Sequence, residues 1–149
     1  MAQTDTYNLQ RFIQAQNNQY TYETALSEIR NGKKRSHWIW YVLPQLRGLG
    51  HSYNSRYYGI SGADEARAYL ADEVLSARLR EVCEALLQVV DADCSVSSVM
   101  GPIDTAKTRS CLTLFDAVCP GEVFGHCLEH CFPGDPDRET LRRLKLAGE

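Results

Sequence analysis

Apolar residues recur about every three or four positions along most of this chain, the spacing of one face of an α-helix. The clearest stretch is 73–90, where Asp72 is a suitable N-cap and the apolar face is Leu75, Leu79, Val82, Leu86 and Val90. Similar spacing predicts helices near 9–16, 21–31, 61–71, 95–100, 104–118, 122–132 and 137–146. The sequence therefore predicts an all-α fold, a compact bundle of about six to eight short helices forming a single domain over residues 1–149.

Several residues predict where these helices begin and end. Asp5 or Thr6 is expected to cap the first helix, and Gly32 suits the left-handed position after the second. Ser61 is expected to open a capping box before the helix ending near residue 71, and Asp104 to cap the helix over 104–118.

The segment 33–44 has no clear periodicity. Its aromatic and β-branched residues favour a strand, whereas Ser36, as an N-cap, and the neighbouring helices favour a helix. Pro44 ends either element.

Composition and charge narrow the function classes. The net charge of −3 argues against general nucleic-acid or membrane-surface binding, which usually needs a basic face. No stretch approaches the ~20 apolar residues of a membrane span, and the polar residues 1–8 lack the features of a signal peptide. A cytoplasmic location is therefore expected, and with it free thiols at the six cysteines.

One central region has a recognisable pattern. The run 32–40 reads GKKRSHWIW, the run 44–50 reads PQLRGLG, and Arg11-Phe12 and Asp104 with Lys107 and Ser110 lie outside them. These residues resemble the family called domain of unknown function 1810, over about residues 7–144. The resemblance implies a compact all-α domain but no activity. Some members carry the label calpastatin, which this globular sequence does not support, since a calpain inhibitor is a disordered repeat chain.

His37, at the centre of this pattern, is the candidate catalytic residue, because an imidazole titrates near neutral pH. A buried histidine that fixes helix packing is the alternative. Lys34, which matches the motif lysine of the family, lies in the basic triplet before Ser36. If Ser36 begins a helix, the cations and free backbone N–H groups form an anion site; a solvated basic turn is the alternative.

Other side chains extend the candidate site. Trp38 offers a ring for stacking, although a core position is the alternative for this segment, and Gln45 precedes a Gly-Leu-Gly turn. Only the family resemblance places Lys107 and Ser110 in the cleft of His37; otherwise Asp104 is a cap and Lys107 an exposed partner. The predicted ligand-binding residues are Arg11, Gln16, Lys34, Ser36, Trp38, Gln45, Asp104, Lys107 and Ser110.

The C-terminal part offers two pairs at helical spacing, His126 with His130 and Cys127 with Cys131. Each pair could contact zinc, but the two pairs point about a third of a turn apart and cannot easily share one ion. We therefore expect buried thiols and surface histidines, with no metal site and no cofactor.

Two functions remain open. The first is a polar cleft that binds an anionic, nucleotide-like small molecule. The Arg-Phe-x-x-Ala-Gln pattern at 11–16 resembles the ADP-ribose-processing NADAR proteins, which would imply cleavage of an N-glycosidic bond. The second is a non-enzymatic interaction module that exposes Trp38 or Trp40 to an unknown protein partner. A concave site that brings His37 and the lysines together would favour the first, and an exposed tryptophan patch the second.

Overall fold

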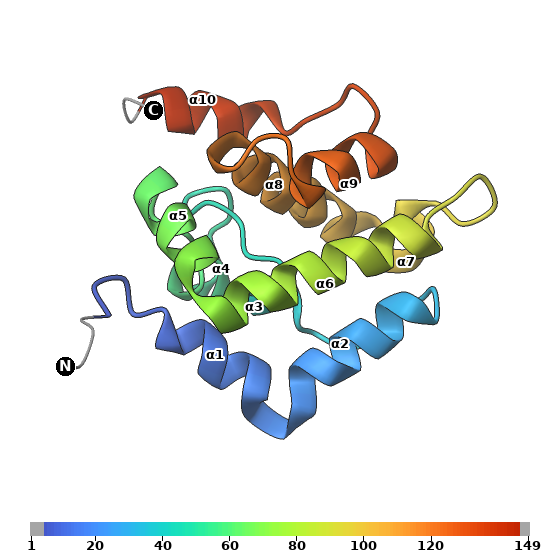
Figure 1. The fold of residues 1–149 in the computed structure, drawn as a ribbon, viewed down its shortest axis with the longest axis horizontal. Helices are drawn as coiled ribbons and strands as arrows, with labels where there is room; N and C mark the ends of the chain where they lie inside the picture. The colour runs from blue at the N-terminus through green and yellow to red at the C-terminus, as the bar shows by residue number, and fades with distance from the viewer. Residues whose placement is uncertain (1–4, 147–149) are drawn as a thin grey trace.

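The computed structural model describes residues 5–146, and this part of the chain is built from helices (Figure 1). They are α1 (Gln10–Asn17), the 3-10 turn η1 (Asn18–Tyr20), α2 (Thr21–Arg30), α3 (Ile39–Val42), α4 (Tyr53–Tyr57), α5 (Ala63–Ala71), α6 (Glu73–Val89), α7 (Val96–Met100), α8 (Pro102–Val118), α9 (Val123–Cys131) and α10 (Arg138–Leu146). Within 5–146 there is no strand, and the only bridge pairs Leu46 with Ile60. The predicted all-α fold is confirmed.

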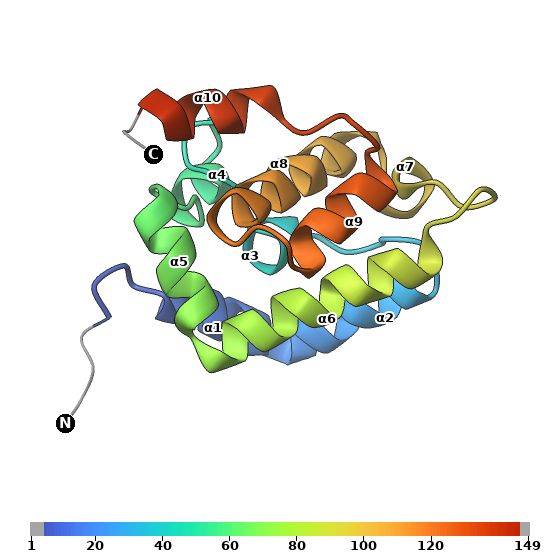
Figure 2. The same cartoon turned by 45° about the horizontal axis from the view of Figure 1, so that its top comes forward.

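The two longest helices, α6 and α8, organise the bundle. Helix α9 packs against both, α2 covers another side of α6, and α5, α7 and α10 pack on α8. In Figure 1, α1 and α2 run below α6, whereas α8, α9 and α10 lie above it. In the turned view of Figure 2, α1 and α2 lie behind α6, and α8, α9 and α10 remain above it. The short helix α3 lies between α1 and α8. The segments before and after α3 lie beside the N-terminal half of α8.

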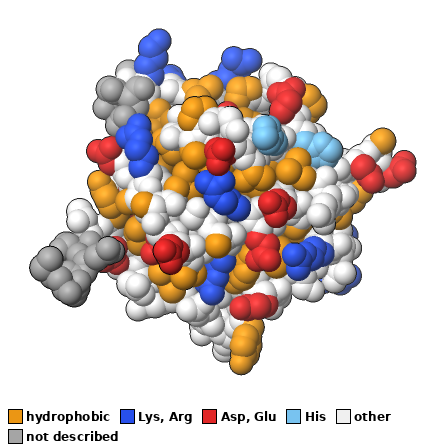
Figure 3. All heavy atoms as spheres, viewed as in Figure 1, with side chains coloured by type: hydrophobic (Ala, Val, Ile, Leu, Met, Phe, Trp, Pro, Cys, Tyr) orange, Lys and Arg blue, Asp and Glu red, His pale blue; other side chains and the backbone are white. Residues whose placement is uncertain are grey.

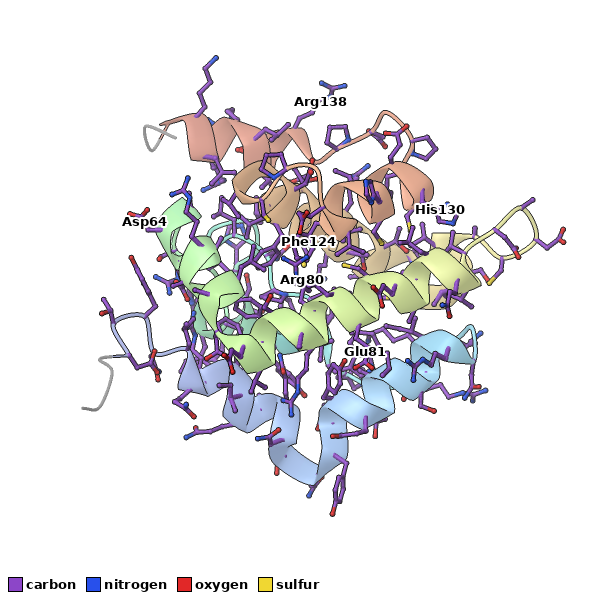
Figure 4. The ribbon with its side chains drawn as sticks, viewed as in Figure 1. Asp64, Arg80, Glu81, Phe124, His130 and Arg138 are labelled. Atoms are coloured by element: carbon purple, nitrogen blue, oxygen red, sulfur yellow. The ribbon has the colours of Figure 1, made fainter. Side chains whose placement is uncertain are left out.

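The predicted face of α6 is the centre of the core. All five of its apolar residues are buried, and the Asp72 carboxylate accepts hydrogen bonds from the N–H groups of Val74 and Leu75, as an N-cap does. Each fully buried leucine contributes roughly 1.5–3 kcal/mol. At the contact with α9, Arg80 lies over the Phe124 ring, 5.0 Å from its centroid (Figure 4).

One other predicted boundary is confirmed and a second is wrong in its position. Leu9, and not Asp5 or Thr6, occupies the N-cap position of α1, although the Asp5 carboxylate accepts hydrogen bonds from the N–H groups of Leu9 and Gln10. Gly32 follows α2 with φ of +81°, the left-handed conformation expected after a helix end.

The predicted caps Ser61 and Asp104 are also wrong, and a helix start at Ser36, one of two open alternatives, is not found. Ser61 does not cap α5; instead its N–H donates to the carboxylate of Glu65, and Gly62 occupies the N-cap position. Helix α8 begins at Pro102, with Gly101 at the N-cap, so Asp104 lies inside the first turn. Ser36 does not begin a helix either.

The ambiguous segment 33–44 is neither a strand nor a full helix. Residues 33–38 are irregular, and only the single turn α3 follows, with Trp38 at its N-cap position. The Ser36 N–H and hydroxyl donate to the carboxylate of Glu28 on α2. Because the side chain and N–H of Ser36 are engaged with α2, Ser36 is not free to cap the next helix.

Residues 5–146 contain no membrane-spanning helix, and the face that carries α6 has charges of both signs. No helix within 5–146 is long and apolar enough to cross a membrane. On the face that carries α6, acidic and basic side chains are interspersed (Figure 3). This mixed pattern is ordinary for a surface exposed to water.

Candidate functional site

Two adjoining cavities lie between the α3 segment and the N-terminal half of α8. The first has a volume of about 360 Å³ and includes Lys34, His37 and Asp104 in its lining. The second, of about 640 Å³, includes Gln45 and Ser110. Both are lined by Trp40, Pro102, Ile103 and Lys107, so they form one continuous depression, called here the α8 groove. The size falls within the ~300–1,000 Å³ of small-molecule sites.

The start of α8 brings charge to this groove. Gly101, with φ of +85°, turns the chain, and Pro102 fixes the first helical residue, so that Asp104 falls in the first turn. One Asp104 oxygen, Oδ2, lies 2.7 Å from the Lys34 ammonium, and Oδ1 lies 3.7 Å from the Lys107 ammonium. The carboxylate therefore sits between two cations.

The two lysines are held very differently. The side chain of Lys34 is only 7% exposed; its ammonium donates to the Ser36 carbonyl as well as to Asp104, and it lies 4.8 Å from the centroid of Trp38. Its own backbone N–H donates to the carbonyl of Val99. Lys34 is thus engaged on every side and acts mainly to position Asp104.

Lys107 is the more available cation. Its side chain is 18% exposed, its contact with Asp104 is long, and its ammonium lies 4.9 Å from the centroid of the Trp40 ring. A cation over an aromatic face is held in place without losing all of its hydrogen-bonding capacity. Lys107 can therefore contact a ligand in either cavity.

His37 lies at the mouth of the first cavity. Its side chain is exposed, and its imidazole makes no hydrogen bond with the part of the chain that the structure describes. Its carbonyl accepts a long hydrogen bond from the Tyr41 hydroxyl. The packing alternative, a buried histidine tied to a carbonyl, does not describe this residue.

Gln45 and Ser110 line the second cavity. Gln45 is 8% exposed, and its backbone carbonyl accepts the N–H of Ile60 at the isolated bridge. The Ser110 hydroxyl donates to the carbonyl of Ala106, one turn earlier on α8. The groove thus gathers six of the predicted residues: Lys34, His37, Gln45, Asp104, Lys107 and Ser110.

Arg11 and Gln16, also predicted for the site, lie outside the groove. Arg11 is buried, forms a 2.7 Å ion pair with Glu65, and donates to four backbone carbonyls. Gln16 donates to the Tyr41 carbonyl and accepts from Arg78. Both residues hold α1 against the rest of the bundle.

Ser36 and Trp38 belong to a separate cluster around Glu28. The Glu28 carboxylate accepts hydrogen bonds from the Arg35 N–H, the Ser36 N–H and hydroxyl, and the Trp38 indole, at 2.6 to 3.0 Å. We call these four donors and their acceptor the Glu28 cradle. Burial raises the pKa of Glu28, but these hydrogen bonds outweigh it and lower the pKa to about 2.

The sequence prediction had missed Glu28. The backbone N–H groups of Arg35 and Ser36 bind a carboxylate of the protein itself, and they do not belong to a helix start, so the anion site expected for a helix beginning at Ser36 is not formed. The available signal was an acidic residue on the preceding helix, eight positions before Ser36. A spacing of eight residues does not by itself predict a contact, because Glu28 reaches Ser36 only when the chain reverses direction at Gly32.

The C-terminal histidine and cysteine pairs do not converge. Nε2 of His130 contacts the Val90 carbonyl at the end of α6, in the region labelled in Figure 4. Within residues 5–146 no group of three or more metal-ligating side chains is placed to share an ion. All six cysteines are free thiols, and burial raises the pKa of Cys111 well above its usual value.

Comparison with known proteins shows the family of the chain. The family described as "Protein of unknown function (DUF1810)" matches residues 6–144. Among solved structures, the conserved hypothetical protein Rv1873 from Mycobacterium tuberculosis is similar, with a TM-score of 0.88 and 39% sequence identity. The match covers 95% of this chain and 99% of that one. No curated protein gives a significant match. Since the family match spans nearly the whole chain, the protein belongs to the DUF1810 family, whose function is unknown.

Proposed function

We propose that the protein binds a small anionic, nucleotide-like molecule in the α8 groove. The observation that carries the proposal is the position of Lys107. Lys107 lines both cavities, and its ammonium group is only partly engaged by Asp104 and lies beside the Trp40 ring. Such a combination suits a ligand that has both a phosphate and a flat ring.

The charge balance at the first cavity also favours an anion. In its lining, Lys34 and Lys107 contribute two positive charges and Asp104 one negative charge, which leaves one positive charge. The second cavity is also lined by the acidic residues Asp137 and Glu139, so the anion is placed at the first cavity. The seventeen-residue helix α8 directs its N-terminus toward the same place, and the partial positive charge there adds to the attraction. A phosphate near Lys107 would take the place of the long contact with Asp104.

The proposal has an enzymatic form, in which the ligand is ADP-ribose-like and its N-glycosidic bond is cleaved. Water would add to the ribose carbon as the carbon–nitrogen bond breaks, and the added water would lose its proton to the solvent. His37 would give a proton to a leaving nitrogen that departs as an anion, as that of an adenine does. The exposure of His37 at the mouth of a cavity that also contains Asp104 is what supports this form.

The alternative, a protein-interaction module built on the Trp38 and Trp40 segment, has less support. Trp38 is 0% exposed and donates its indole N–H to Glu28, so it cannot dock a partner in the folded protein. Trp40 is only partly exposed and lies against Lys107.

Calorimetric titration and thermal unfolding test the binding proposal. The ligands are ribose 5-phosphate, AMP, ADP-ribose, NAD and inorganic phosphate, with wild type and the variants Lys107→Met and Lys33→Met. At about 100 times its dissociation constant, a ligand adds roughly 2.7 kcal/mol of stability. At least one phosphate-bearing ligand should bind wild type, and Lys107→Met should weaken it about tenfold or more.

Lys33→Met is the matched control, because Lys33 is an exposed lysine of the same basic triplet that does not line the groove. It should bind as wild type does. If both substitutions weakened ligand binding equally, the effect would come from the net charge of the protein and not from a site at Lys107. If no ligand bound to wild type, the proposal would be rejected. The enzymatic form is tested by product release from bound ADP-ribose or NAD, which His37→Ala should abolish.

A further inference from the structure

We infer that the uncharged end of the ligand is a nucleobase, and that Gln45 recognises its hydrogen-bonding edge in the second cavity. This inference rests on the proposed function, since it takes the anion to be bound at Lys107. The starting observation is a buried polar side chain without a partner. Gln45 is only 8% exposed, lines the second cavity, and its carboxamide makes no hydrogen bond with any side chain or backbone group of residues 5–146.

The carboxamide of Gln45 is open to the cavity and not sealed in the core. The fully buried side-chain polar atoms without a hydrogen-bond partner in the described chain include the Ser55 hydroxyl but no atom of Gln45. Polar groups inside folded proteins nearly always have hydrogen-bond partners, and for this carboxamide a molecule in the cavity would supply them. The other buried glutamine shows the ordinary case: Gln16 uses both its amide nitrogen and its oxygen within the protein. Gln45 therefore keeps a donor and an acceptor for something that enters the cavity.

The surrounding chain keeps space beside this side chain. Gly50 lies against it: a Cβ at that position would be 3.9 Å from Gln45 Nε2 and 2.5 Å from the Ser55 hydroxyl. A side chain at position 50 would clash with the Ser55 hydroxyl and would come into van der Waals contact with the Gln45 carboxamide. The Ser55 hydroxyl is itself buried and has no hydrogen-bond partner in the described chain. Two polar groups without partners thus adjoin one glycine that lines the cavity.

The chemistry of a carboxamide selects the ligand class. Its oxygen accepts and its nitrogen donates, side by side, so it pairs with any edge that presents a donor next to an acceptor. Nucleobases present such edges, and glutamine pairs with adenine in this way. Trp40 and Leu49 line the same cavity and provide flat and apolar surface for the ring.

The relative positions agree with one ligand that spans the groove. Lys107 and Trp40 line both cavities, whereas Gln45 lines the second alone. A nucleoside phosphate could then place its phosphate at Lys107 and its base against Gln45. Ribose 5-phosphate would occupy only the first of these contacts.

The test compares affinities for ribose 5-phosphate and for AMP, GMP, CMP and UMP by calorimetric titration. In wild type, at least one nucleotide should bind about tenfold more tightly than ribose 5-phosphate. Gln45→Met, which keeps the length of the side chain and removes both polar atoms, should abolish that advantage and leave ribose 5-phosphate binding unchanged. If Gln45→Met does not fold, Gln45→Asn serves, since it keeps an uncharged carboxamide and withdraws it from the cavity by one methylene group.

The outcomes separate the two proposals. The role of Gln45 in binding the base is wrong if ribose 5-phosphate binds through Lys107 but no nucleotide binds more tightly. It is also wrong if a nucleotide still binds more tightly than ribose 5-phosphate after the Gln45 amide is removed. In both cases the anion site at Lys107 is retained. If no phosphate-bearing ligand depends on Lys107, the proposed function itself fails. Retention of the ribose 5-phosphate affinity in the Gln45 variants excludes simple loss of structure.

Discussion

The protein contains two kinds of polar region. Their sequences look alike, because both are rich in charged residues, but the structure separates them. In the closed regions, the Glu28 cradle and the Arg11–Glu65 pair, each charged group is surrounded by partners from the chain itself. In the α8 groove, by contrast, Lys107 is loosely paired and Gln45 has no partner among residues 5–146. The difference is the reason for proposing a ligand site in the α8 groove: its polar groups are left loosely paired or without partners by the described chain, whereas charge alone is common to both kinds of region.

The largest expected effect would come from breaking a closed region at Arg11. Arg11→Met leaves the Glu65 carboxylate buried without its cation, which typically costs about 3–5 kcal/mol of folding free energy. Urea unfolding monitored by circular dichroism measures it. Arg56→Met, at an exposed arginine, is the control and should change stability by less than about 0.5 kcal/mol. Similar values for both variants would show that the Arg11 pair is not a closed structural region.

The sequence allowed the fold to be predicted better than the site, for a physical reason. Helical periodicity and local caps such as Asp72 act over a few residues, so the pattern of α6 could be read directly. The fate of the basic triplet depends on Glu28, which lies across a turn, and no local pattern reveals that a carboxylate folds back onto it.

The predicted site residues also differ in whether local sequence could reveal their positions. The family resemblance placed Lys107 and Ser110 in the cleft of His37, and the structure does bring them to one groove. Arg11 and Gln16 share the polar character of those residues, yet they face the core of the bundle. Whether a polar residue of an amphipathic helix faces a cavity or a neighbouring helix depends on tertiary packing, which the periodicity of one helix does not encode.

The next effect concerns the Glu28 cradle. Glu28→Ala removes the acceptor of four hydrogen bonds and should lower the free energy of unfolding by about 2–3 kcal/mol. The same substitution at Glu23, an exposed residue of α2, is the control. Thermal unfolding of both variants compares them. A loss at Glu28 no greater than at Glu23 would mean that the cradle is not a closed anion site.

Acid should weaken the cradle in a defined pH range. The pKa of Glu28 lies at about 2 in the folded protein, below its usual 4.5, so the carboxylate stabilises the fold fully above pH 4.5. That contribution is lost as the pH falls from 4.5 toward 2. The stability difference between wild type and Glu28→Gln should therefore shrink across this range, as measured by urea unfolding at each pH. A difference that stays constant down to pH 2 would contradict the assigned pKa.

The smallest effect on stability is expected in the open region, where Lys107→Met tests the contrast most sharply. Lys107 contributes a long ion pair and a contact with the Trp40 ring, each worth no more than about 1 kcal/mol at a partly exposed position. The free energy of unfolding should thus change by less than about 1 kcal/mol, whereas ligand affinity should fall about tenfold. The closed regions should behave in the opposite way, with large losses of stability. If Lys107→Met destabilised the protein as much as Arg11→Met, Lys107 would be part of the framework, and the groove would be one more closed region instead of a site.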